Sequence, residues 1–192
     1  MGVGRSPTGS AEELPVPRRR LGVVLLLPDP AATEVDGLRR ALGDGSLGRI
    51  PAHLTLVPPV NVRDDDMPAA LDVLRQAASQ TRALDLRLGP ATTFHPATPV
   101  VYLGVHGDVA ALHALRGRIL RPPLERPLTR AFVPHVTLAD EFDPDRIPAA
   151  VAALADYVVD VRFEAVDVLE EGRGRVWRPI AGARFSTRWL PG

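Results

Sequence analysis

Two tetrapeptides of the form H-x-T-L carry the residue types in this chain that could perform chemistry. His53-Leu54-Thr55-Leu56 lies in the first third of the chain, and His135-Val136-Thr137-Leu138 lies in the last third. Side chains of a strand alternate between two faces, so the histidine and the threonine of each motif would point the same way. Two such strands on either side of a cleft would combine two imidazoles and two hydroxyls.

This set of side chains suits acid–base chemistry on a phosphodiester. An imidazole titrates near pH ~6.5, so at neutral pH one histidine can be the base and the other the acid. The base would take a proton from the attacking water or hydroxyl, and the acid would give one to the leaving oxygen. Thr55 and Thr137 would donate hydrogen bonds to the phosphoryl oxygens without adding charge. The residues leave open which of His53 and His135 is the base.

Longer segments around both motifs resemble the paired signatures of the two-histidine (2H) phosphoesterase superfamily. These segments are Ile50–Pro58 and Phe132–Ala139, and the resemblance spans about residues 21 to 190. The branch that this chain resembles most is the bacterial RNA 2′,3′-cyclic phosphodiesterases, also called 2′-5′ RNA ligase-like proteins. The resemblance implies a bilobal α+β fold, with two pseudo-symmetric lobes of mainly antiparallel sheet, outer helices and a central cleft. A basic residue often follows the second T-L-A in that family, whereas this chain has Asp140-Glu141.

The resemblance also implies an activity. The implied enzyme is a metal-independent phosphodiesterase that hydrolyses RNA-type 2′,3′-cyclic phosphate, or cleaves or joins 2′-5′ linkages. In such an enzyme His53 and His135 would be the acid and the base, and Thr55 and Thr137 would bind the phosphate. Its partner would be an RNA terminus or a small nucleotide phosphodiester. Two alternatives remain: an enzyme that acts on a small cyclic nucleotide or nucleotide-sugar cyclic phosphate with the same site, and a catalytically inactive RNA-binding module. Turnover of a 2′,3′-cyclic nucleotide in the presence of EDTA would separate the enzyme from the module.

Length and composition are those of one bilobal domain. The chain has 192 residues, and we expect residues 20–192 to form this domain after a disordered tail at 1–19. It has no cysteine, which excludes disulfides and thiolate metal sites. Arg and Lys together number 23, as do Asp and Glu, so any RNA contact must be local. No stretch approaches the ~20 apolar residues of a membrane span. We expect a cytoplasmic monomer without metal or cofactor.

Apolar periodicity and turn residues predict strands and helices in alternation. The first H-x-T-L strand is expected to end at Pro58-Pro59. The other predicted strands are Leu21–Leu27, Leu84–Leu88, Val100–Val105, the second H-x-T-L motif, Val158–Leu169, Val176–Ile180 and Arg184–Leu190. The predicted helices are Thr33–Leu42 closed by Gly43, Asp64–Ser79, Val109–Leu120 and Pro144–Ala155.

Tyr102 and Arg130 are candidates for substrate contacts outside the two motifs. Tyr102 could line the cleft or stack on a base, although a strand aromatic is more often part of the core. Arg130 lies five residues before His135, where the chain enters the second strand, and could contact phosphate. Other arginines could form a basic rim, but arginines on helices and loops are mostly solvated; they are Arg116, Arg118, Arg121 and Arg126.

No metal site is expected, because the chain lacks close ligand spacings such as H-x-x-x-H. Consecutive helix residues point in different directions, so Asp64-Asp65-Asp66 is predicted to cap a helix and not to bind a metal. The remaining histidines are predicted to be non-catalytic; they are His95, His106 and His113.

Overall fold

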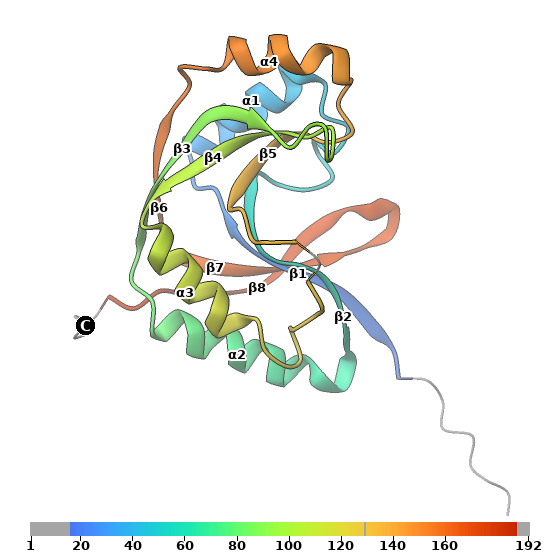
Figure 1. Cartoon of the computed structure of the whole chain (residues 1–192). Helices are drawn as coiled ribbons and strands as arrows, with labels where there is room; N and C mark the ends of the chain where they lie inside the picture. The colour runs from blue at the N-terminus through green and yellow to red at the C-terminus, as the bar shows by residue number, and fades with distance from the viewer. Residues whose placement is uncertain (1–15, 129, 188–192) are drawn as a thin grey trace, which may run out of the picture.

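The computed structural model describes residues 16–128 and 130–187, which form an α+β fold around one curled antiparallel sheet (Figure 1). Within these residues the sheet has eight strands in the order β6-β3-β4-β5-β2-β1-β7-β8. The strands are β1 Arg18–Leu26, β2 His53–Arg63, β3 Leu84–Thr93, β4 Val101–Gly107, β5 His135–Ala139, β6 Val159–Phe163, β7 Ala165–Glu171 and β8 Trp177–Arg184. The helices are α1 Ala31–Leu42, α2 Met67–Ser79, α3 Val109–Ile119 and α4 Ile147–Ala153, with 3₁₀ turns at Asp64–Asp66, Pro144–Arg146 and Arg173–Arg175.

The sheet divides into two four-stranded units. β2, β1, β7 and β8 form one unit, and β5, β4, β3 and β6 form the other. Among the described residues, one ladder pair joins the units, Leu54 of β2 with Val136 of β5. The predicted α+β fold with two similar antiparallel lobes is confirmed. The lobes are not the two halves of the chain, however, because β1 near the start of the fold pairs with β7 near its end.

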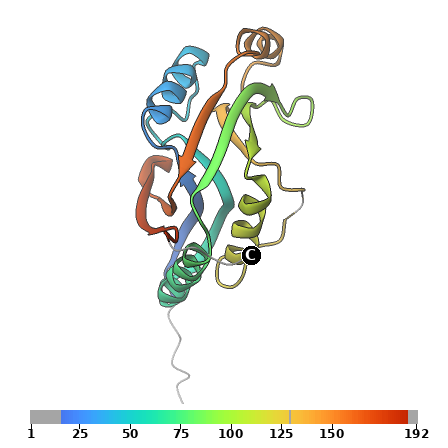
Figure 2. The ribbon, with the colours of Figure 1, turned by 90° about the vertical axis from the view of Figure 1, so that its left-hand side faces the viewer.

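The helices lie in two pairs at the ends of the sheet. In Figure 1, α1 and α4 are at the top and α2 and α3 at the bottom, and Figure 2 shows the same pairs from the side. α2 packs against α3 and β8, α1 against β5, and α4 against β3. Gly43 ends α1 as predicted, with a φ of 78° that glycine adopts without steric cost. None of the helices in the described ranges is long and apolar enough to span a membrane.

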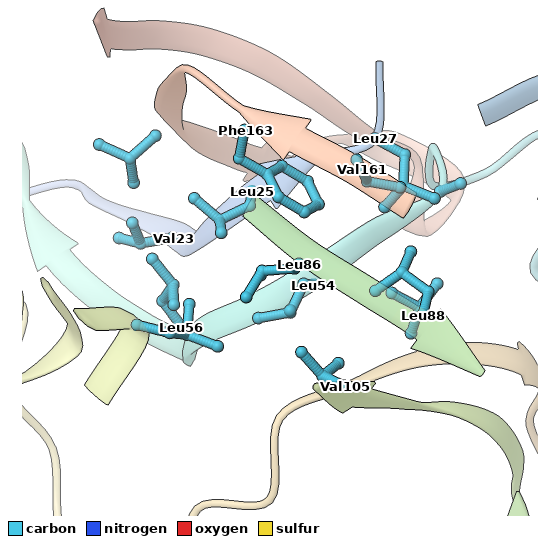
Figure 3. Close-up of a cluster of buried hydrophobic side chains, with 14 of the residues drawn as sticks. Val23, Leu25, Leu27, Leu54, Leu56, Leu86, Leu88, Val105, Val161 and Phe163 are labelled. Carbon is cyan, nitrogen blue, oxygen red and sulfur yellow. The ribbon is translucent and has the colours of Figure 1, made fainter. Parts of the chain in front are cut away.

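The core fills the inside of the curl and fixes which face of β2 carries the polar residues. Leu54 and Leu56 of β2 are buried there with Leu25 of β1, Leu86 of β3 and Phe163 of β6 (Figure 3). Side chains alternate along a strand, so the histidine and threonine of this motif face the other way.

The predicted long strand Val158–Leu169 is wrong. The chain leaves β6 at Phe163 and enters β7 at Ala165, and these strands belong to different units. The alternation changes phase here, because the buried residues are Val161 and Phe163 before Glu164 but Val166 and Val168 after it. The chain crosses from one unit to the other through Glu164 alone, and this change of phase is the signal in the sequence that marks the crossing.

The prediction that the first H-x-T-L strand ends at Pro58-Pro59 is also wrong, because β2 runs past these prolines. The ladder between β1 and β2 changes register at this point: Val57 pairs with Val23, and Val60 pairs with Leu21. The prolines therefore lie at an irregularity of the ladder, where a missing N–H group costs no regular strand–strand hydrogen bond.

The two ends of the fold differ slightly from the predicted boundaries. β1 begins at Arg18, two residues before the predicted start of the domain, so the arginine run belongs to a strand. The predicted tail at 1–15 lies outside the described residues. β8 is continuous up to Arg184, where a further strand was predicted to begin, and residues 188–190 of that predicted strand also lie outside the described residues.

Candidate active site

The ladder pair between β2 and β5 places four polar side chains on one face. In the register of that pair, His53 lies opposite Thr137, and Thr55 lies opposite His135. The paired apolar residues between them are buried on the core side, so the four polar side chains share the other face. Directly opposed residues have Cβ atoms about 4.5–5.5 Å apart. Each histidine therefore faces the threonine of the other motif, and the two histidines lie on a diagonal.

Both imidazoles are held by the same local hydrogen bond. Nδ1 of His53 donates to the carbonyl oxygen of Pro51 at 2.8 Å, and Nδ1 of His135 donates to that of Val133 at 2.7 Å. A carbonyl oxygen only accepts, so Nδ1 carries the hydrogen in both rings and Nε2 is the nitrogen that titrates. The two motifs thus repeat each other in ring orientation as well as in sequence.

Burial lowers the pKa of both histidines below the usual 6.5. In His53 the positive charges of Arg39 and His135 lower the pKa further, while the Pro51 carbonyl acts in the opposite direction. In His135 only the Val133 carbonyl opposes burial. At pH 7 both rings are therefore mainly neutral in the free protein, and a bound anion would be needed to favour protonation of one of them.

A cavity of about 770 Å³ opens beside this face of the sheet, a size typical of ligand sites. His135, Thr55 and Thr137 line it, whereas His53 lies beyond the lining, opposite Thr137. Apolar and aromatic side chains form much of the wall, and they include Phe94, Val100, Leu128, Phe132 and Val133. The charged lining residues are Arg116, Arg126, Arg130 and Asp140.

Tyr102 lies beside the site, paired with Thr137 in the ladder of β4 with β5, and is not part of the cavity lining. It is 8% exposed and stacks on Phe94, with ring centroids 4.1 Å apart. Phe94 and Tyr102 both contact the ring of His135 edge-on, with centroids at 5.0 and 5.3 Å. In this position Tyr102 supports the imidazole, and Phe94 is the aromatic residue that faces the cavity. The sequence gives little signal for Phe94, because this residue lies one position after the end of β3.

Some of the arginines that were predicted to form a basic rim line the cavity, and others do not. Arg130 is exposed and lines the cavity, as its position before His135 predicts. Arg116 and Arg126 also line the cavity, whereas Arg118 and Arg121 are not among the lining residues. The expectation that Arg116 is solvated is wrong, because this side chain is partly buried.

A buried ion pair supports the segment that leads into His53. Arg39 at the end of α1 is 3% exposed, and its Nε donates to Asp44 at 2.8 Å. Its Nη1 also donates to the carbonyl oxygen of Ile50 at 3.1 Å, and its Nη2 donates to Ser46 at 3.1 Å. This group was not predicted from the sequence, although an arginine with acidic residues three before it and five after it is a usable signal.

Arg39→Ala should lower the free energy of unfolding by about 3–5 kcal/mol, because it leaves the Asp44 carboxylate buried without its partner. Urea denaturation of the purified protein measures this change. The matched control is Arg40→Ala, an exposed neighbour on the same helix, for which a change within about 0.5 kcal/mol is expected. Equal urea midpoints for the two variants would contradict the role given to Arg39.

Within the described residues, no group of three or more His, Cys, Asp or Glu side chains is placed to hold a metal ion. Asp64–Asp66 form a 3₁₀ turn before α2. Asp66 occupies the N-cap position, but its side chain makes no capping hydrogen bond, so this acidic run can act on the helix only through its charge.

Residues 27–175 match the sequence pattern of the family described as the 2′-5′ RNA ligase superfamily. The chain belongs to this superfamily. The assignment made from the two H-x-T-L motifs is thereby confirmed. Membership of this superfamily supports an enzyme of the phosphodiesterase type.

Two relatives of this member of the 2′-5′ RNA ligase superfamily align with it over most of its length. A Bacillus pumilus protein named "Putative phosphoesterase" is 29% identical over 159 residues, which are 80% of this chain and 92% of the relative. A Bacillus licheniformis protein of the same description is 26% identical over 167 residues, covering 83% of this chain and 98% of the relative.

Solved structures of other proteins share the fold. Escherichia coli LigT complexed with 3′-AMP aligns with a TM-score of 0.60 at 17% identity, covering 89% of this chain and 100% of LigT. A Thermus thermophilus protein aligns with a TM-score of 0.58 at 18% identity, covering 88% of this chain and 100% of its own. At these identities the similarity establishes a LigT-like fold and nothing finer.

Proposed function

We propose that the protein is a metal-independent phosphodiesterase that hydrolyses an RNA-type 2′,3′-cyclic phosphate by two-histidine acid–base catalysis. The observation that carries the proposal is the symmetric placement of His53 and His135. Each ring is fixed through Nδ1 by a backbone carbonyl, and each faces the threonine of the other motif. Superfamily membership supports the phosphodiesterase class.

In the proposed reaction the cyclic phosphate lies between the two Nε2 atoms. One neutral imidazole takes a proton from a water molecule, whose oxygen forms a new bond to phosphorus. The bond from phosphorus to one ribose oxygen breaks, and the other imidazole, as imidazolium, protonates that oxygen. The hydroxyls of Thr55 and Thr137 donate hydrogen bonds to the non-bridging oxygens, where negative charge develops. The product is a nucleoside monophosphate, and exchange with solvent restores both imidazoles.

A small cyclic nucleotide as the physiological substrate is the second candidate. The cavity volume of about 770 Å³ could hold a single nucleotide, with Phe94 available to stack on its base. This candidate uses the same four residues and the same chemistry. It differs from RNA only in what the rest of the cleft binds.

Turnover of a fluorescent or chromogenic nucleoside 2′,3′-cyclic phosphate should persist in EDTA and show a bell-shaped dependence on pH. Because both histidine pKa values lie below 6.5, the optimum of kcat/KM should lie below pH 6.5. A bound phosphate anion favours the imidazolium, so the alkaline limb of kcat should lie at higher pH than that of kcat/KM. Both limbs belong to the coupled pair and not to one residue.

The pH profiles with and without EDTA are the measurement, and added Zn²⁺ or Mn²⁺ provides the comparison. Loss of turnover in EDTA, with a single sigmoid restored by metal, would indicate a metal-bound water as nucleophile. The two-histidine mechanism would then be wrong. RNA binding without any turnover would instead favour the inactive binding module.

A further inference from the structure

Arg116 brings a cation from α3 into the cleft beside Thr55. In the described part of the chain β2 and β5 share one ladder pair. Beyond that pair, the carbonyl oxygen of Leu56 accepts a hydrogen bond from Nε of Arg116 at 2.9 Å. The guanidinium carbon lies 4.3 Å from the ring centroid of Phe132, which lines the same cavity. The Leu56 carbonyl and the Phe132 ring together hold the guanidinium in one orientation.

This arginine lacks the partner that a partly buried cation usually has. Burial lowers the pKa of Arg116. Within residues 16–128 and 130–187, no carboxylate forms an ion pair with it, and the Leu56 carbonyl accepts only from Nε. Both terminal nitrogens therefore remain able to donate to a ligand. Planar pairs of N–H groups of this kind match the oxygens of a phosphate.

The cleft has a positively charged end, and Arg116 lies at that end. Leu56 follows Thr55 by one residue, a rise of about 3.3 Å along β2. Further along β2, Arg126 donates to the carbonyl oxygen of Pro59 at 2.5 Å and also lines the cavity. Asp140 lies at the opposite end, because β5 runs antiparallel to β2. An extended anion would therefore run from the histidine pair toward Arg116.

We propose that Arg116 forms a second phosphate subsite, which binds a phosphate group adjacent to the one between the histidines. The inference rests on the proposed function and adds a substrate preference to it. The preferred substrate carries a second phosphate, as an RNA terminus or a 5′-phosphorylated nucleotide does, and a nucleoside 2′,3′-cyclic monophosphate alone leaves the subsite empty. The two sources share the phosphate chemistry and differ in whether that group is a diester or a terminal monoester.

Binding of two non-cyclic nucleotides by isothermal titration calorimetry tests the subsite without any need for turnover. The wild-type protein should bind adenosine 3′,5′-bisphosphate at least ~10-fold more tightly than adenosine 3′-monophosphate, because a charge-assisted hydrogen bond is gained. Arg116→Gln, whose amide can still donate to the Leu56 carbonyl, should remove this preference and leave binding of the monophosphate unchanged. Arg118→Gln, on the same helix but not among the cavity-lining residues, is the matched control and should keep it.

Turnover separates the two phosphate sources and the two proposals. We expect kcat/KM for a dinucleotide ending in a 2′,3′-cyclic phosphate, or for a 5′-phosphorylated cyclic nucleotide, to exceed that of the unphosphorylated one, with the difference mainly in KM. The substrate with the larger kcat/KM shows whether the second phosphate is a diester or a terminal monoester.

A bisphosphate preference that is absent, or that survives in Arg116→Gln, would overturn the subsite. If Arg116→Gln does not fold, Arg116→Lys, which keeps the charge but not the planar donor pair, should show a reduced preference, and an unchanged one would overturn the subsite. An Arg116-dependent preference without turnover would leave the subsite in place and reject the proposed hydrolysis.

Discussion

Replacement of either His53 or His135 by alanine should lower kcat by roughly 10²–10⁴, the contribution of one proton-transfer partner. Asparagine is the sharper substitution, because its side-chain amide can still donate to the carbonyl of Pro51 or Val133 while lacking a titrating nitrogen. The His→Asn variants should therefore fold like the wild type and lose turnover to the same extent. Steady-state rates on a 2′,3′-cyclic nucleotide measure the effect.

His106 provides the control for these variants. It is exposed on β4 and lies outside the cavity lining, so His106→Gln should retain the wild-type kcat. The variant that lacks both His53 and His135 should be little worse than the poorer single variant, because groups that act as one unit are strongly non-additive. A folded single variant with near-wild-type kcat would remove that histidine from the mechanism.

Loss of both threonine hydroxyls should lower kcat by about 10²–10³, the cost of removing an oxyanion donor from an ordered site. Thr55→Val and Thr137→Val, which keep a branched side chain and remove the hydroxyl, should each cost less than the adjacent histidine variant, since two donors share the developing charge. Measurement of kcat and KM separately shows whether the hydroxyls act in the transition state or in both states alike.

Serine at the same positions keeps the hydroxyl and removes only a methyl group. Thr55→Ser and Thr137→Ser should therefore stay close to the wild-type rate. If the serine and valine variants lost activity equally, packing of the methyl group would explain the effect, and the hydrogen-bonding role would be wrong. A threonine variant worse than its neighbouring histidine variant would reverse the assignment of roles.

The pairing of the two motifs could be predicted because strand alternation links side-chain type to strand face. In both motifs a residue at position two is buried and those at positions one and three are not, as Leu54 and Val136 show. The hydrogen bonds through Nδ1 could not be predicted, because they depend on the carbonyl two residues before each histidine and on the local bend of the chain.

Residues that act through distant contacts were beyond the sequence analysis. Arg116 was one arginine among several, and only the separation of β2 from β5 beyond one ladder pair gives it the Leu56 carbonyl as a partner. The prediction of one strand across β6 and β7 failed for a different reason, since the change of phase after Glu164 marks a break between strands. Which strands become neighbours is decided by the curl of the whole sheet.

The pairing of β1 with β7 also bears on the time course of folding. Leu21 lies beside Glu170, so one of the central ladders of the sheet joins residues separated by most of the described chain. Closing a loop of that length costs entropy before any contact is gained, and non-local pairings of this kind slow folding. During synthesis β1 and β2 can pair early, but the free edge of β1 remains without its neighbour until β7 has left the ribosome. The polypeptide therefore completes its sheet late, and its newly made first half presents an apolar strand edge that is open to association with other chains.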